Sequence, residues 1–125
     1  MLKLKIMYSF TFERLEVWQK SRSLTKTIYK ITLDLPNTEK FGLINQIRRA
    51  AISVCSNIAE GSARVSKKEQ KYFYEISFSS LMEVMNQLIL SHDLGYINSK
   101  LLQELRIKIE MISYMLLKLR DSRVK

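Results

Sequence analysis

The chain has 125 residues, a formal net charge of +9 and an isoelectric point near 9.8. Its apolar content of 46 %, with only 3 Gly and 1 Pro, disfavours a disordered chain and a turn-rich all-β fold. The single cysteine excludes an internal disulfide, and neither a secretory signal nor an apolar run of about 18 residues is present. We therefore expect one cytoplasmic domain without a membrane partner, and the charge makes an acidic partner such as nucleic acid plausible.

The first predicted helix follows a short basic and apolar N-terminal lead, residues 1–11. Apolar residues recur at helical spacing over residues 13–35. Pro36 should end this helix, because proline disfavours helical geometry in the residue before it. Thr38 is a candidate N-cap for a second helix that should continue to about Glu60.

The stretch from Gln46 to Gly61 has the strictest helical periodicity in the chain. Its apolar seam consists of Ile44, Ile47, Ala51, Val54 and Ile58. Such alternating steps of three and four residues are typical of a helix that packs lengthwise against its neighbours. Gly61 follows the seam, where a left-handed C-cap residue is expected.

Two further helices are predicted after this stretch. Ser66 and Glu69 have the spacing of a capping box, which should start a third helix that reaches about Leu94, with Gly95 as its C-cap. Asn98 or Ser99 should begin a fourth helix.

Four helices with connectors of roughly three to five residues predict an all-α domain over residues 12–125, folded as an antiparallel up-down-up-down four-helix bundle. The third helix carries a second apolar row, and the fourth adds Ile107, Met111 and Tyr114 opposite its main seam. Surplus apolar rows usually mark contact with another chain, so we expect a homo-oligomer. The alternative is that these rows are wide core faces.

No motif for catalysis or metal binding stands out. A carboxylate metal site in a helical bundle needs Glu-x-x-His pairs on two helices, whereas the single histidine, His92, has Ile89 and not Glu three residues before it. His92 continues an apolar seam and is interpreted as a partly buried or interface histidine, and Cys55, which lies among small apolar residues, is interpreted as a small core residue. We expect no cofactor, no metal and no enzymatic activity.

Five polar residues are interpreted as structural or interface groups: Arg48, Asn57, Glu60, Ser80 and Glu83. Arg48 falls inside the apolar arc, so its guanidinium should reach backbone carbonyls or a carboxylate, Glu83 or Glu60. A side chain that extends to water from the edge of the arc is the alternative. Asn57 would need partners if a second chain covered it, and the small Ser80 permits close helix approach.

Charge is expected to gather at one end of the predicted bundle, where the second helix ends, the third begins and the fourth ends. The candidate nucleic-acid-binding residues there are Arg64, Lys67, Lys68, Lys71, Arg120 and Arg123. Lysines in the first turns of a helix oppose its dipole, whereas a bound phosphate would satisfy both the lysines and the free amides. The alternative is a basic end that is merely solvated.

Several residues of the first two helices and the following turn form a pattern shared with a known family. They are Leu15, Val17, Trp18, Gln19, Pro36, Glu39, Gly42, Leu43, the run 46–61, Arg64 and Ser66. On these residues the sequence resembles the bacterial four-helix-bundle family of proteins encoded in ribosomal RNA intervening sequences and of retroelement accessory variability determinants. The family's Ala-x-Gly-Ser-x-x-Glu motif is similar to the segment that contains Ser77, Ser79, Ser80 and Glu83, with serine replacing alanine and glycine.

The resemblance implies a pentameric ring of four-helix protomers. In the retroelement branch it also implies binding of a reverse transcriptase and of nucleic acid through a basic surface. We therefore expect a non-enzymatic homo-oligomer, a pentamer by the resemblance, whose basic end binds RNA or DNA, with a ribosome or reverse transcriptase as a further partner. The alternative is a protein–protein interaction adaptor whose basic end meets an acidic protein.

Overall fold

The computed structural model describes residues 8–123, and over this part of the chain it consists of helices and turns without a strand. The elements are η1 (Thr11–Arg14), α1 (Glu16–Thr32), η2 (Asn37–Glu39), α2 (Leu43–Ser62), α3 (Lys67–Asp93) and α4 (Ser99–Asp121), where η denotes a 3₁₀ turn. The predicted all-helical class is confirmed. Residues 1–7 of the predicted N-terminal lead lie outside the described residues.

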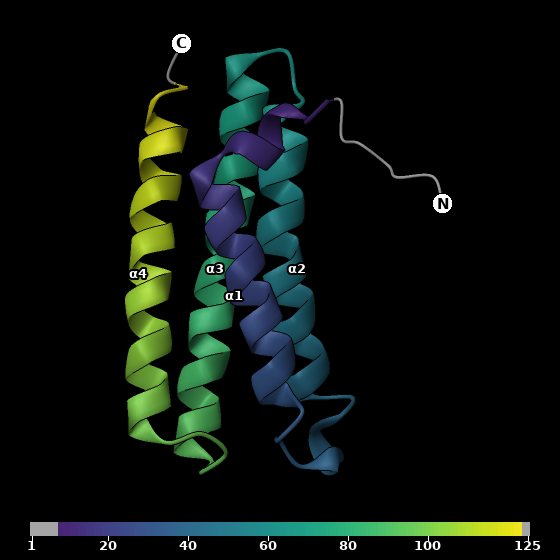
Figure 1. Cartoon of the computed structure of the whole chain (residues 1–125), viewed down its shortest axis with the longest axis vertical. Coiled ribbons are helices and arrows are strands. Elements are labelled where there is room, and N and C mark those ends of the chain that lie inside the picture. Colours follow the sequence, from purple (N-terminus) through teal and green to yellow (C-terminus); the bar gives the residue numbers. More distant parts are fainter. Residues whose placement is uncertain (1–7, 124–125) are drawn as a thin grey trace, which may run out of the picture.

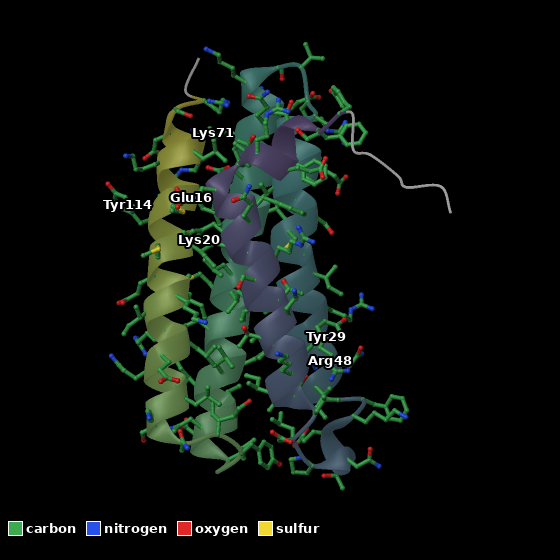
Figure 2. The ribbon with its side chains drawn as sticks, viewed as in Figure 1. Glu16, Lys20, Tyr29, Arg48, Lys71 and Tyr114 are labelled. Atoms are coloured by element: carbon green, nitrogen blue, oxygen red, sulfur yellow. The ribbon has the colours of Figure 1, made fainter. Side chains whose placement is uncertain are left out.

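The four long helices lie side by side, and the chain reverses direction from each to the next (Figure 1). Each of α1, α2 and α3 packs against the helix that follows it, most extensively α2 against α3, whereas α1 and α4 touch more lightly. The start of α1, the α2–α3 turn and the end of α4 therefore share one end of the molecule. Glu16 and Lys71, near the starts of α1 and α3, are both found toward this end (Figure 2).

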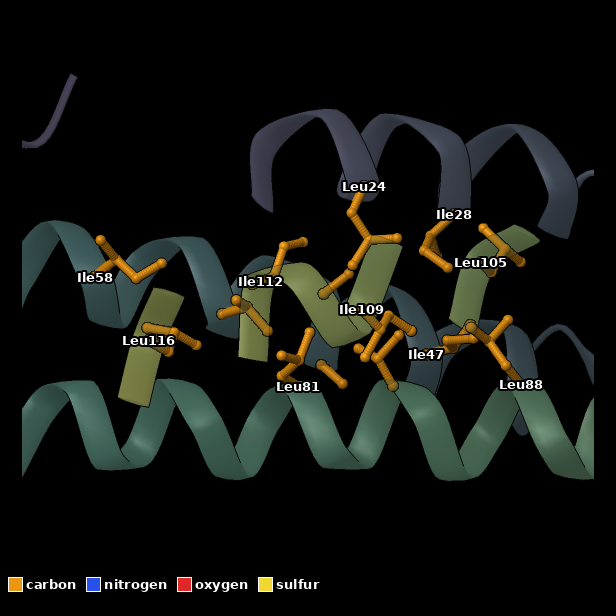
Figure 3. Close-up of a cluster of buried hydrophobic side chains, with 14 of the residues drawn as sticks. Leu24, Ile28, Ile47, Ile58, Leu81, Leu88, Leu105, Ile109, Ile112 and Leu116 are labelled. Atoms are coloured by element: carbon orange, nitrogen blue, oxygen red, sulfur yellow. The ribbon is translucent and has the colours of Figure 1, made fainter. Parts of the chain in front are cut away.

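The core is built from inward-facing aliphatic side chains of all four helices (Figure 3). Ile28, Ile58, Leu81 and Leu116 are fully buried, one from each helix. Burial of such a side chain stabilises the fold by about 1.5–3 kcal/mol, so this core of all four helices is the main source of stability. No helix among residues 8–123 is long and apolar enough to cross a membrane.

The first two helices begin later than predicted. Residues before Glu16 form a 3₁₀ turn, in which the backbone N–H of Phe10 donates to Oε1 of Glu13 at 2.7 Å. Thr38 is not an N-cap, because it lies within η2, and α2 starts only at Leu43. The carboxylate of Glu39 accepts from the backbone N–H of Leu43 at 3.3 Å and so supplies the acceptor expected from Thr38.

Gly61 is not a left-handed C-cap, which corrects the sequence prediction. It lies inside α2, is buried, and does not have a positive φ. A Cβ at this position would approach Cε1 of Tyr74 to 2.7 Å and Cβ of Phe73 to 3.0 Å. Glycine is present here because α3 passes too close to α2 for any side chain.

The predicted caps of the other helix ends are found. Ser66 is the N-cap of α3, where its hydroxyl accepts from the backbone N–H of Glu69 at 3.1 Å. Gly95 has a φ of +81° directly after α3 and so turns the chain in the left-handed region. Asn98 caps α4 by accepting from the backbone N–H of Leu101 at 2.8 Å.

Candidate nucleic-acid interface

Three lysines at the start of α3 are free to meet an anion. Lys67 and Lys68 occupy the first turn and are exposed, and Lys71 follows one turn later and is half-buried. None of the three makes an ion pair or a side-chain hydrogen bond with residues 8–123. Since cations at a helix N-terminus cost a few tenths of a kcal/mol, this arrangement favours a site for a negatively charged ligand.

Arg64 lies in the turn between α2 and α3, close to these lysines. Its guanidinium carbon is 4.6 Å from the centre of the Phe73 ring, and one guanidinium nitrogen is 4.0 Å from Oε1 of Glu60. Both charged side chains are about half exposed. The contact with Phe73 holds the guanidinium over the beginning of α3, while its charge stays accessible to solvent.

The two predicted arginines of α4 are engaged within the chain. Arg120 pairs with Asp121, with a nitrogen–oxygen distance of 2.9 Å. Arg123 donates from Nε to Oε1 of Gln70 at 2.6 Å, and Gln70 donates to the backbone carbonyl of Arg64 at 2.8 Å. The end of α4 is thus tied to the α2–α3 turn, which gathers all six predicted residues at one end of the molecule.

At the opposite end of the molecule a side-chain hydrogen bond joins two turns. The Tyr96 hydroxyl donates to Oε2 of Glu39 at 3.0 Å, across 57 residues of sequence. This hydrogen bond to the Glu39 carboxylate raises the pKa of Tyr96 above its ordinary value, because ionisation of the phenol would remove the donor. The residues of this end include both signs of charge: Asp34, Glu39, Lys40, Asp93, Lys100 and Glu104.

Arg48 binds the end of α1 instead of the predicted carboxylates Glu60 or Glu83. Its Nε donates to Oγ1 of Thr32 at 2.8 Å, and a terminal nitrogen donates to the carbonyl of Tyr29 at 3.3 Å. The guanidinium carbon also lies 4.5 Å from the centre of the Tyr29 ring (Figure 2). Of the two kinds of partner predicted for Arg48, a backbone carbonyl or a carboxylate, the structure therefore shows the backbone carbonyl. The charge of Arg48 also complements the C-terminal dipole of α1.

The other predicted structural groups fall into two sets. Asn57 donates to the carbonyl and to the hydroxyl of Ser53, and the Ser53 hydroxyl is 2.8 Å from the hydroxyl of Ser80, so these three groups link α2 to α3. Asn57 therefore has partners within its own chain. Glu60 and Glu83 are exposed, and Glu83 makes no hydrogen bond or ion pair with the described residues.

The cysteine and the histidine lie in different surroundings. Burial raises the pKa of the Cys55 thiol, which is 3.4 Å from the hydroxyl of Thr25, so this thiol is a poor nucleophile. His92 is partly exposed at the α3–α4 turn, where its Nε2 is 2.9 Å from the hydroxyl of Ser99. Within residues 8–123 no three potential metal-ligating side chains of His, Cys, Asp or Glu cluster together.

A second basic surface, not predicted from the sequence, lies along α1. Arg22, Lys26 and Lys30, here called the α1 basic row, are exposed and follow one another at steps of four residues. They line a shallow hollow of about 280 Å³ together with Gln19, Ser23 and Thr27. The signal was present in the sequence, because residues spaced by four lie on one helix face.

The fold and the surface define a small, basic, all-helical protein with accessible cations. Comparison with protein families then identifies the chain: residues 13–118 match the 23S rRNA-intervening sequence proteins, and the chain belongs to this family. Among solved structures it is similar to a protein of unknown function from the S23 ribosomal protein family of Bacteroides thetaiotaomicron. The similarity has a TM-score of 0.75 at 21 % identity and covers 83 % of this chain and 97 % of the other, which supports the fold. No curated protein matches the chain.

Proposed function

We propose that this protein is a non-enzymatic, cytoplasmic, nucleic-acid-binding bundle that acts through its basic end. The observation that carries the proposal is the group of three lysines at the start of α3, Lys67, Lys68 and Lys71, which lack acidic partners among the described residues. Their charge and the free amides of the helix start would both be satisfied by phosphate. Binding through the phosphate backbone would be salt-sensitive and weakly sequence-selective.

The proposed active form is a homo-oligomer of up-down-up-down four-helix bundles. Support comes from exposed apolar side chains on one face of α4: Ile107, Met111 and Tyr114 are 54 %, 49 % and 63 % exposed. Contact with a second copy would remove this surface from water. By resemblance to the family the oligomer is a pentamer, and protomers that point the same way would join five basic ends into one rim. A ribosome or a reverse transcriptase would be a further partner.

The test measures binding of labelled RNA and DNA at increasing salt. The wild-type protein should lose affinity steeply between about 50 and 200 mM salt, and replacement of Lys67, Lys68 and Lys71 by Glu should weaken binding at least tenfold. A control with two charge reversals at the opposite end, Lys40 and Lys100 to Glu, should retain most of the affinity. Absence of binding by the wild-type protein even at low salt would refute the proposal.

A protein–protein adaptor is the second candidate function, and exposed apolar residues beside the basic end favour it. Val65, in the α2–α3 turn, is 98 % exposed, and Tyr72 on α3 is 60 % exposed. Apolar and aromatic side chains of this kind are used in protein interfaces. A pull-down from nuclease-treated lysate distinguishes the two functions, because an adaptor retains one protein partner and loses it when Val65 and Tyr72 are changed to Ser.

A further inference from the structure

The α1 basic row is a concentration of charge that the basic end does not explain. Helix α1 carries four cations, Lys20, Arg22, Lys26 and Lys30, against one carboxylate, Glu16. That carboxylate is 3.8 Å from Lys20, so it is not paired with the row (Figure 2). Like charges four residues apart on a helix destabilise it by a few tenths of a kcal/mol per pair. The row is therefore unfavourable for the isolated fold, and binding of an anion would relieve its repulsion.

The hollow beside the row is lined only by residues with polar or charged side chains. It is bounded by Arg22, Lys26 and Lys30 and by the amide and hydroxyl side chains of Gln19, Ser23 and Thr27. Protein interfaces have a core rich in aromatic and apolar residues, whereas nucleic-acid interfaces are more polar and more positively charged. A phosphate backbone is thus the anion that this surface fits best.

Exposed aromatic rings lead up to the row from the segment before α1. The rings of Tyr8 and Phe10 are in edge contact at 5.1 Å, and those of Phe10 and Phe12 are stacked at 6.4 Å. Phe12 in turn meets Trp18 edge-on at 4.9 Å. Tyr8 and Phe10 are 68 % and 59 % exposed, so the outer rings of this series present free faces to solvent.

The aromatic series and the basic row meet at one residue. The guanidinium of Arg22, the first member of the row, is 5.4 Å from the centre of the Trp18 ring. Rings and cations therefore form one continuous surface. From Arg22 to Lys30 the row spans about 12 Å, so it is long enough to contact more than one phosphate of a strand.

We propose that this surface binds single-stranded nucleic acid, with phosphates on Arg22, Lys26 and Lys30 and an unpaired base stacked on Phe10. The proposal rests on the proposed nucleic-acid-binding function and assigns the form of the ligand. Stacking on a side chain requires a base that is not already stacked and paired in a duplex. A positively charged track combined with exposed rings is the arrangement by which proteins hold single strands without reading their sequence.

The test compares fluorescence anisotropy of an oligouridine of about 12 nucleotides with that of the same strand paired to its complement. The wild-type protein should bind the single strand at least tenfold more tightly. Replacement of Arg22, Lys26 and Lys30 by Gln should lower the slope of log affinity against log salt by about 2, three lost phosphate contacts on a single strand. Phe10→Leu, which keeps an apolar side chain but removes the ring, should weaken single-strand binding roughly 5- to 150-fold and leave duplex binding unchanged.

A matched variant separates this inference from the proposed function. Replacement of Lys67, Lys68 and Lys71 by Gln should weaken binding of both the single strand and the duplex and leave the preference for the single strand in place. Circular dichroism confirms that every variant is folded. If the α1 variant and Phe10→Leu both bind like wild type while the α3 variant loses affinity, the inference is wrong and the proposed function stands. An equal affinity of the wild-type protein for single strand and duplex overturns the inference as well. If the wild-type protein binds neither ligand at low salt, both are wrong.

Discussion

The α2–α3 and α1–α4 contacts are built on different principles. Between α2 and α3 small residues bring the two backbones together: Gly61 lies against Tyr74, and the Ser77 hydroxyl donates to the carbonyl of Val54 at 2.8 Å. Between α1 and α4 two hollows of about 150 and 310 Å³ remain. They are lined by Lys20, Ser23, Leu24, Lys108, Met111 and Ile112, and by Leu15, Glu16, Val17, Met115, Lys118 and Leu119.

The difference shows where the fold tolerates change. Interiors are packed as densely as organic crystals, so the α2–α3 contact should respond to the addition or removal of a single methyl or hydroxyl group. The α1–α4 contact borders solvent and has room for added side-chain atoms. Stability should therefore be most sensitive to changes between α2 and α3, while the exposed faces of α1 and α4 can vary with the demands of binding.

The largest effect is expected from Gly61→Ala. Alanine is favoured over glycine in a helix by about 1 kcal/mol, but the new Cβ would clash with buried Tyr74, and overpacking of this kind costs about 1–3 kcal/mol. We expect a lower free energy of unfolding in urea. Ser56→Ala at an exposed position of the same helix should change it by less than about 0.5 kcal/mol. A Gly61→Ala protein more stable than wild type by about 1 kcal/mol would show that α3 can move away without cost, because only the gain in helix propensity would remain.

Ser77→Ala should lower the free energy of unfolding by about 1 kcal/mol. The hydroxyl is fully buried and donates to the carbonyl of Val54, so its removal deletes one interhelix hydrogen bond. Ser79→Ala, two residues along α3 and exposed, provides the matched control. Equal urea midpoints for the two variants would contradict a specific role for the α2–α3 hydrogen bond.

Filling the smaller of the two α1–α4 hollows should raise the free energy of unfolding instead of lowering it. Ser23→Leu places an aliphatic side chain beside Leu24 and Met111 and should stabilise the protein by about 0.5–1 kcal/mol, through buried apolar area and helix propensity together. Thr27→Leu, one turn further along the same face, measures the propensity contribution separately. Thermal denaturation measures the gain in stability of both variants. Equal gains for Ser23→Leu and Thr27→Leu would mean that filling the hollow contributes nothing.

The smallest effect is confined to alkaline pH. Burial raises the pKa of Tyr74 above its ordinary value, and the nearby charge of Arg123 opposes this only in part. A raised pKa means that the folded protein favours the neutral phenol, so this contribution to stability is present below about pH 10 and is lost as pH rises through the raised pKa. Urea unfolding between pH 9 and 11 should show a steeper loss for wild type than for Tyr74→Phe. Parallel pH profiles would contradict the assignment.

The fold was predictable where a local pattern has one structural meaning. The caps Ser66, Gly95 and Asn98 mark helix ends by hydrogen bonds or backbone geometry that their own segment determines. Gly61 was misinterpreted because a glycine after an apolar seam serves equally as a C-cap and as a point of close helix contact. Only the position of Tyr74 on another helix distinguishes the two.

The candidate site was predictable in composition but not in its internal contacts. The sequence indicated the lysines at the start of α3, whereas the bond between Arg123 and Gln70 depends on two helices that are distant in sequence. Arg48 was recognised as partly buried, yet its partners Thr32 and Tyr29 follow from how α2 crosses the end of α1. The α1 basic row was missed because charge was summed over helix ends and not over helix faces.

The loose contact between α1 and α4 also has a consequence for how the chain folds. It joins helices that are farthest apart in sequence, whereas α1–α2, α2–α3 and α3–α4 are neighbours along the chain. Bringing α1 and α4 together closes the longest loop and so costs the most chain entropy, while the packing between these two helices is the least extensive. This contact should therefore form last. Substitutions in α2–α3 should then slow folding, and substitutions between α1 and α4 should mainly accelerate unfolding.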